Sequence, residues 1–167
     1  MGLPGTGKST TSRVIQEIID KDNCILINSD ITRDNFVEKK YFELNKTKKG
    51  SVKQRTYELM FAQAKDFFSK GKSVIIDAMF HEQNTRDLAL KSLGEKNCTI
   101  LEIICSDEKL LEKRIEKRRS EGKDSSTAGF DIYLQFKPQW EKIIGNKITI
   151  DSKYDIKNQI NMLLEKL

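Results

Sequence analysis

The sequence is poor in histidine, cysteine and proline, and it has no long apolar run. Its 167 residues include one histidine, three cysteines and two prolines. The lone histidine, His81, excludes a histidine-rich metal site, and we expect it to be a loop residue rather than a catalytic one. Cys24, Cys98 and Cys105 occupy apolar stretches without metal-ligand spacing, which predicts free thiols in a reducing, cytoplasmic setting. No apolar segment approaches the ~20 residues that span a membrane, so no membrane partner is expected.

The composition is that of a globular chain. Hydrophobic residues make up 37% and charged residues 33% of the sequence, and the length predicts a single domain covering residues 1–167. The formal net charge of +5 is compatible with an anionic partner, nucleic acid included. The abundance of lysine, isoleucine and asparagine fits an AT-rich gene equally well, so both explanations of the charge stay open.

The first ten residues contain a motif with a defined chemistry. Gly2, Gly7, Lys8 and Ser9 match G-x-x-x-x-G-K-[ST], the pattern of a phosphate-binding loop. Glycines let successive backbone N–H groups face a polyphosphate, and the helix that follows adds the positive end of its dipole. Lys8 would contact the β- and γ-phosphates of ATP, and Ser9 would hold Mg²⁺. The predicted nucleotide-binding residues are Gly2, Gly5, Thr6, Gly7, Lys8, Ser9 and Thr10. The alternative is a glycine-rich helix start that binds nothing.

Helical and strand-like segments alternate along the rest of the chain. Apolar residues recur with helical spacing at 8–20, 54–69, 85–93 and 106–119, with Ser106 as the expected N-cap of the last. Short apolar runs predict buried strands at 24–27, 73–77, 99–104 and 147–151. A final helix is expected to face the core with Ile156, Ile160, Leu163, Leu164 and Leu167. The alternation predicts an α/β fold of three layers, αβα, with a mainly parallel sheet and a small helical lid near 114–130.

One element is missing from this pattern. A phosphate-binding loop of this type joins a strand to a helix, and only Met1 precedes the loop here. We expect the N-terminal strand before the loop to be absent, which would leave two sheet edges unpaired in the middle of the sheet. A truncated chain explains this start, and a short protein with a gap in its sheet is the alternative.

Further candidate groups follow the predicted strands. Asp30 could accept a proton from an acceptor hydroxyl while Arg33 holds the acceptor, although a helix cap and a surface arginine would look the same. Asp77 ends a strand and could lie beside Mg²⁺ or orient Arg33; the alternative is a turn-forming aspartate. Arg114 and Arg118 lie four residues apart on one helix and could neutralise charge on a transferring phosphoryl group, or form a solvated basic face.

Taken together, these motifs resemble those of small P-loop kinases. The segments that carry the resemblance are Gly2–Thr10, Ser29–Arg33, Val74–Ala78 and Arg114–Arg118. The nearest group is the polynucleotide 5′-hydroxyl kinase domain with its relatives, often called AAA-domain ATP-binding proteins; zeta toxins and seryl-tRNA kinases are more distant.

The resemblance implies a role for each matched residue. Asp30 would be the general base and Arg33 the acceptor-site arginine. Arg114 or Arg118 would be the lid arginine, while Lys8 would contact the triphosphate. Ser9 and Asp77 are the expected Mg²⁺ residues.

These roles define an expected function. The chain would use ATP and Mg²⁺ to transfer the γ-phosphoryl group to a hydroxyl acceptor, either a polynucleotide 5′ end or a small molecule. The alternatives are a nucleotide-dependent switch or accessory ATPase without an acceptor, and an inactive fragment.

Overall fold

The architecture alternates strands and helices. The computed structural model describes residues 1–37, 49–121 and 129–165. The strands are β1 (Cys24–Asn28), β2 (Ser73–Asp77), β3 (Leu101–Ile104) and β4 (Ile148–Asp151). The α-helices are α1 (Lys8–Ile19), α2 (Ser29–Thr32), α4 (Lys49–Ser69), α5 (Gln83–Leu93), α6 (Glu108–Glu121), α7 (Phe130–Phe136) and α8 (Ile156–Leu164). Shorter helical turns are η1 (Arg33–Val37), η2 (Glu95–Asn97) and η3 (Lys137–Gln139).

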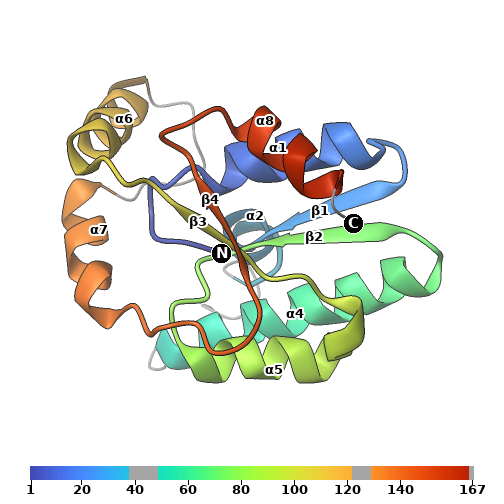
Figure 1. The fold of residues 1–167 in the computed structure, drawn as a ribbon. Helices are drawn as coiled ribbons and strands as arrows, with labels where there is room; N and C mark the ends of the chain where they lie inside the picture. The colour runs from blue at the N-terminus through green and yellow to red at the C-terminus, as the bar shows by residue number, and fades with distance from the viewer. Residues whose placement is uncertain (38–48, 122–128, 166–167) are drawn as a thin grey trace.

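The helices form layers on both sides of the strands (Figure 1). Helices α1 and α8 lie on one side, and α4 and α5 lie on the other. Helices α6 and α7 form a separate pair at one end of the strands, at the left of the view. The three-layer αβα arrangement predicted from the alternating pattern is therefore confirmed, and its strands are parallel where they pair.

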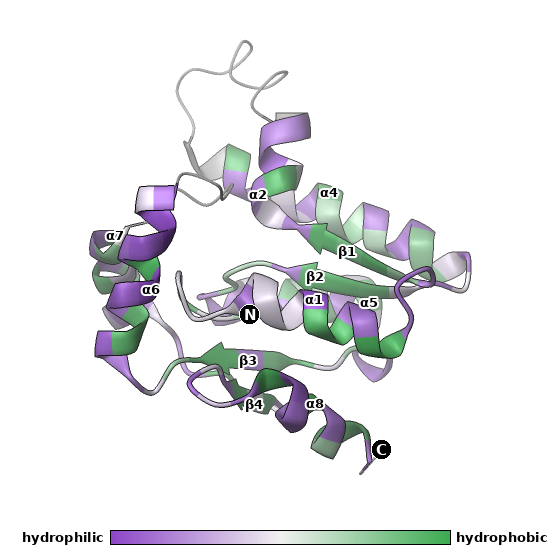
Figure 2. Cartoon of the chain, turned by 90° about the horizontal axis from the view of Figure 1, so that it is seen from above, coloured by the Kyte–Doolittle hydropathy of each residue, from purple (hydrophilic) through white to green (hydrophobic). Residues whose placement is uncertain are grey.

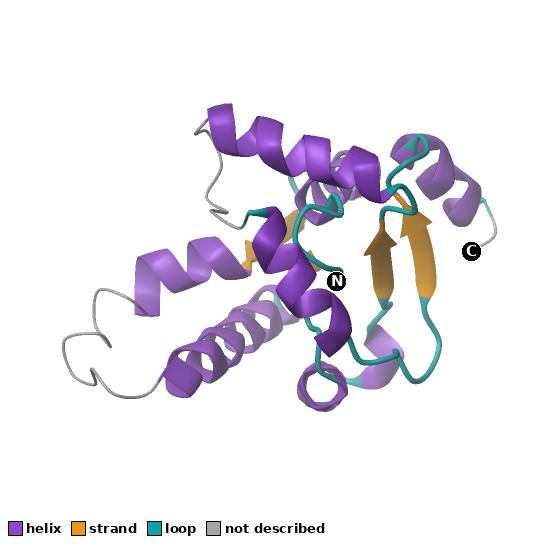
Figure 3. Cartoon of the chain, turned by 90° about the vertical axis from the view of Figure 1, so that its left-hand side faces the viewer, coloured by secondary structure: helices purple, strands orange, loops and turns teal. Residues whose placement is uncertain are grey.

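The strands pair in two separate halves. β1 pairs with β2 and β3 pairs with β4, both in parallel, and Figure 3 shows β3 and β4 side by side. Between the halves lies Met1, whose N-terminal amine donates to Leu101 O at 2.7 Å and whose carbonyl accepts from Ile103 N at 2.8 Å. On the other side, Gly2 N donates to Met79 O at 3.3 Å. The first two residues of the chain therefore bridge the two pairs of strands.

Apolar clusters join the strands to the helices that cover them, and the strands are coloured as largely hydrophobic in Figure 2. The β1–β2 half packs on α4 through a cluster of Ile27, Tyr57, Met60, Phe61, Ala64, Ala78 and Phe80. The β3–β4 half packs on α1 and α8 through Ile15, Ile103, Ile150 and Ile160. A third cluster, Leu111, Ile115 and Tyr133, joins α6 to α7 and includes Leu3 of the phosphate-binding loop. The strands are thus largely covered by helices, as their continuous apolar runs predict, although Ser73 and Thr149 are exposed.

Some local predictions are corrected by the structure. The N-cap of α6 is Asp107, not Ser106, because the Asp107 carboxylate accepts from Leu110 N at 3.0 Å. Leu164 is 42% exposed and does not face the core, and Leu167 lies outside the described residues. Helices α4 and α5 begin earlier than their apolar spacing indicates, since polar residues form their first turns. Helix boundaries are the weakest part of a pattern-based assignment for this reason.

Candidate functional site

The phosphate-binding loop enters α1 through glycines in left-handed backbone conformations. Gly5 has φ 79° and Gly7, the residue before α1, has φ 91°. A Cβ atom on Gly5 would lie 2.5 Å from the side chain of Ile115, and one on Gly7 would lie 3.1 Å from Cβ of Ser152. Both positions favour glycine for their left-handed backbone, and Gly5 also because a side chain there would clash with Ile115. The loop is pressed closely against α6 and the end of β4.

The carbonyl of Leu3 organises the inside of the loop. It accepts from the backbone N–H of Thr6 at 3.3 Å, from Thr6 Oγ1 at 2.8 Å and from Lys8 Nζ at 2.9 Å. Burial lowers the pKa of Lys8, and the nearby carboxylates of Asp77 and Asp30 partly offset that effect. The Lys8 side chain thus lies between the loop and two acidic groups.

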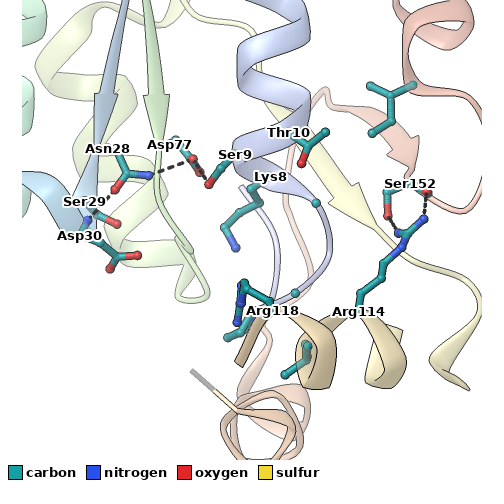
Figure 4. Close-up of a pocket in the computed structure, with 15 residues that line it drawn as sticks. Lys8, Ser9, Thr10, Asn28, Ser29, Asp30, Asp77, Arg114, Arg118 and Ser152 are labelled. Atoms are coloured by element: carbon teal, nitrogen blue, oxygen red, sulfur yellow. Dashed lines mark hydrogen bonds between the residues drawn. The ribbon is translucent and has the colours of Figure 1, made fainter. Parts of the chain in front are cut away.

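These groups open into a pocket of about 400 Å³ (Figure 4). Its lining includes the predicted residues Gly5, Gly7, Lys8, Ser9, Thr10, Asp30, Asp77, Arg114 and Arg118. Gly2, Thr6 and Arg33 were also predicted but are not among the lining residues. Lining residues that the sequence reasoning missed are Pro4, Asn28, Ser29, Ile115, Ser152 and Ile156. Asn28 and Ser152 could have been found as polar residues at or just after the ends of buried strands.

Asp77 is held against the first turn of α1. Ser9 Oγ donates to Asp77 Oδ2 at 2.7 Å, and Asn28 Nδ2 donates to the same oxygen at 3.0 Å. A hydroxyl beside a carboxylate is a donor set that suits Mg²⁺, which binds few protein oxygens and takes its other ligands from water and phosphate. Among the described residues no cluster of three or more His, Cys, Asp or Glu side chains forms a metal cage. The residues present fit a Mg²⁺ ion bound together with nucleotide phosphates.

Asp30 and Arg33 form an ion pair at the rim of the pocket. Arg33 Nη2 lies 3.2 Å from Asp30 Oδ1, and Arg33 Nε lies 3.7 Å from Asp34 Oδ1. The structure does not pair Asp77 with Arg33, because Arg33 pairs with two other carboxylates while Asp77 accepts from Ser9 and Asn28. Asp30 is the member of this pair that lines the pocket.

The two α6 arginines have different surroundings. Arg114 donates from Nη1 to Ser152 Oγ at 3.0 Å and from Nη2 to Ser152 O at 2.9 Å, which ties α6 to the end of β4. Arg118 lies one turn further along the pocket, and its charge contributes to lowering the pKa of Lys8. Figure 4 shows Arg118 on the side of the pocket where Lys8 points. The lid predicted near 114–130 continues into residues 122–128, which lie outside the described residues.

His81 lies in the loop after β2 and is 5% exposed, packed edge-on against Phe136. It does not line the pocket. Burial lowers its pKa below the ordinary 6.5, Lys53 adds to the effect, and Glu82 opposes it. Its Nδ1 has no hydrogen-bond partner among the described residues.

The buried imidazole predicts a pH-dependent stability. A pKa below 6.5 in the folded state means that the unfolded chain binds the proton more readily. The stabilisation should be complete above pH 6.5 and be lost as pH falls through the folded pKa, with a slope of at most about 1.4 kcal/mol per pH unit from this group. We expect His81→Gln to lower the slope of the free energy of unfolding, measured by urea unfolding between pH 7.5 and 5. The buried amine of Met1, whose pKa is lowered to about 5, adds a slope of the same sign to both proteins. Equal slopes in both proteins would contradict the assignment.

The remaining sequence predictions concern thiols and membrane segments. Cys24, Cys98 and Cys105 are all free; Cys24 is buried and the other two are half-buried. No helix in the described ranges has the length and apolarity needed to cross a bilayer.

A comparison with protein families identifies the chain. The model of the AAA domain family matches residues 1–142. The chain belongs to this family. This match covers the loop, Asp30, Asp77 and α6 of the AAA domain.

Solved structures share the fold of this AAA domain at low sequence identity. A gluconokinase from Sinorhizobium meliloti is 14% identical with a TM-score of 0.69, over 99% of this chain and 87% of that one. Kti12 of Chaetomium thermophilum, solved with ADP-AlF3, is 15% identical with a TM-score of 0.69, over 99% and 94%. The APS kinase CysC of Mycobacterium tuberculosis, solved with AMPPNP and APS, is 14% identical with a TM-score of 0.69, over 99% and 92%. The predicted P-loop kinase fold is therefore confirmed.

Proposed function

We propose that the protein is an ATP- and Mg²⁺-dependent phosphotransferase that moves the γ-phosphoryl group to a hydroxyl acceptor. The observation that carries the proposal is the set of residues that line one pocket. It brings together the phosphate-binding loop, the Ser9–Asp77 pair, Asp30, and the arginines of α6. Membership of the AAA domain family and the kinase fold support nucleotide binding.

The pocket divides into regions suited to different parts of the reaction. The loop amides and Lys8 would bind the phosphates at the centre. At one end lie Asn28, Ser29 and Asp30, where an acceptor would enter. At the other end lie Thr10 and Ser152, where a base and ribose could rest (Figure 4), and the apolar Ile156 also lines the pocket. The nucleotide would thus lie across the start of α1.

Each side chain then has one task in the transfer. Asp30 would hold the acceptor hydroxyl and accept its proton as the oxygen attacks. Lys8 and Arg118 would stabilise negative charge on the transferring group, and Arg114, already fixed on Ser152, would keep α6 over the nucleotide. A bound Mg²⁺ would supply charge neutralisation on the β- and γ-phosphates. Positioning and electrostatics would provide most of the rate, because phosphoryl transfer needs little covalent help from the protein.

The acceptor is a hydroxyl compound of one of two classes, a polynucleotide 5′ end or a small molecule. The test is an acceptor screen with ATP labelled at the γ-phosphate, using oligonucleotides with 5′-hydroxyl ends, nucleosides, sugars and sugar acids. Label that moves to one acceptor class supports the proposal. Label that appears only as free phosphate with every acceptor supports the alternative, a nucleotide-dependent switch or accessory ATPase.

Replacing Asp30 separates transfer from binding. We expect Asp30→Ala to slow transfer by ~100-fold or more, because a positioned general base contributes about 10²–10⁴. ATP affinity should change little, since Asp30 lies at the acceptor end. Asp34→Ala is the matched control: Asp34 also pairs with Arg33, at 3.7 Å, but does not line the pocket. A normal transfer rate in Asp30→Ala would remove Asp30 from the mechanism.

A further inference from the structure

Asn28 occupies a special position between the two acidic residues of the pocket. It is the last residue of β1 and lies directly opposite Asp77, the last residue of β2, in the parallel register. Paired residues project to the same face of a sheet, so their side chains can meet. Asn28 Nδ2 donates to Asp77 Oδ2 at 3.0 Å, the oxygen that also accepts from Ser9 Oγ. The carboxylate is thereby held from two sides.

The other end of the same amide faces the acceptor side. Asn28 Oδ1 accepts from the backbone N–H of Asp30 at 2.9 Å and of Ile31 at 3.2 Å, as the N-cap of α2. Its nitrogen faces a carboxylate and its oxygen faces two N–H groups, so the opposite orientation of the amide would lose all three bonds. One side chain therefore joins Asp77 to the backbone of Asp30.

We infer that Asn28 is a positioning residue that fixes Asp30, at the acceptor end, relative to Asp77, at the Mg²⁺ end. The inference rests on the proposed function of this pocket. Helix capping alone does not account for the residue, because serine and aspartate cap as well as asparagine does. Aspartate has no donor, and the short hydroxyl of serine holds donor and acceptor on one atom, whereas asparagine has a separate amide nitrogen that binds Asp77 while its oxygen caps the helix. Asn28 would thus keep the metal side and the acceptor side in register without touching the reacting atoms.

Two substitutions distinguish the bond of Asn28 to Asp77 from its capping bonds to the first turn of α2. Asn28→Ser keeps an oxygen for the α2 cap but is too short to reach Asp77. Asn28→Ala removes both contacts. Asp20→Ala is the matched control, because Asp20 stabilises the turn at the opposite end of β1 through Asp22 N at 3.0 Å and Asn23 Nδ2 at 2.6 Å, remote from the pocket.

Three quantities are measured on the full chain. The first is the Mg²⁺ concentration that gives half-maximal binding of a fluorescent ATP analogue. The second is hydrogen exchange at the amides of Asp30 and Ile31. The third is the melting temperature. We expect Asn28→Ser to raise the Mg²⁺ requirement about tenfold, as the loss of an outer-shell contact to a metal ligand does. Its exchange at Asp30 and Ile31 should match wild type, whereas Asn28→Ala should show both defects.

The outcomes distinguish this inference from the function on which it rests. Wild-type protein that fails to bind the analogue overturns both. Wild-type binding together with an unchanged Mg²⁺ requirement in Asn28→Ser overturns the inference alone, and leaves Asn28 as a helix cap. If Asn28→Ala does not fold, Asn28→Ser still decides. A raised Mg²⁺ requirement in Asp20→Ala as well would assign the effect to general destabilisation and overturn the inference too.

Discussion

Lys8→Ala should lower the affinity for Mg²⁺-ATP and slow phosphoryl transfer at least ~100-fold, the scale expected on losing one preorganised charge or donor from a catalytic site. The expectation follows from where Lys8 lies. Its ammonium reaches back to Leu3 O at 2.9 Å, inside the loop that would surround the phosphates. Alanine removes the positive charge that Asp77 and Asp30 face, and so leaves a pocket that is more repulsive to a polyphosphate.

The measurement is a titration with a fluorescent ATP analogue, followed by single-turnover transfer on the acceptor found in the screen. Lys65→Ala is the control, since Lys65 is exposed on α4 and its loss changes the net charge equally. We expect Lys65→Ala to bind like wild type. Wild-type affinity in a folded Lys8→Ala protein would rule out a phosphate site at the loop, and with it the proposed phosphotransferase.

The phosphate-binding loop could be predicted from the sequence because its chemistry requires particular residues at fixed spacing. Gly5 and Gly7 adopt left-handed conformations, and Lys8 begins helix α1. The residue types of this short segment are therefore enough to predict the conformation of the loop. The strand pattern was equally readable, since buried parallel strands are continuous apolar runs. Asp30 and Asp77 could then be placed at one edge, because the carboxyl ends of parallel strands meet there.

The contacts between distant segments could not be predicted in the same way. Arg114 was expected to face a nucleotide, yet it is bonded to Ser152, 38 residues away in the chain. Arg33 was predicted to hold the acceptor, and the sequence did not indicate that its side chain pairs with Asp30 and Asp34. Long side chains such as arginine can reach several partners, and only the packed structure selects among them. Asn28 was missed for a related reason: its role depends on register with Asp77.

The burial of Arg86 could not be predicted from any pattern in the sequence. It lies in the helical segment that was predicted for α5, where an arginine would ordinarily face water. In the structure it is 1% exposed, and its guanidinium lies 5.0 Å from the ring centroid of Trp140. Burial lowers its pKa, while Glu141 and Glu102 oppose that shift. The helical pattern identified the element correctly, but it could not identify which polar residue is buried in it.

Arg86→Ala should destabilise the fold by about 3–5 kcal/mol, because the guanidinium is a buried donor to several carbonyl oxygens. The guanidinium donates to Phe80 O at 2.8 Å, to His81 O at 2.9 Å and to Glu141 O at 2.8 Å. Alanine would leave these carbonyls without that donor, at about 1–3 kcal/mol for each buried group that stays unsatisfied. At 2–4 °C per kcal/mol for a chain of this size, the melting temperature should fall by roughly 6–20 °C.

Two further variants make the Arg86 prediction specific. Arg86→Lys keeps the positive charge, but its single ammonium cannot donate to all the carbonyl oxygens that the planar guanidinium of Arg86 contacts. Its melting temperature should therefore lie between those of wild type and Arg86→Ala. Arg55→Ala removes an exposed arginine that pairs with Glu58 at 3.0 Å on α4, and should change stability by less than about 1 kcal/mol. An Arg86→Ala protein that melts like Arg55→Ala would show that the loop after β2 is held by other contacts. A fall confined to Arg86 variants would show that one buried cation joins this loop to the segment before β4.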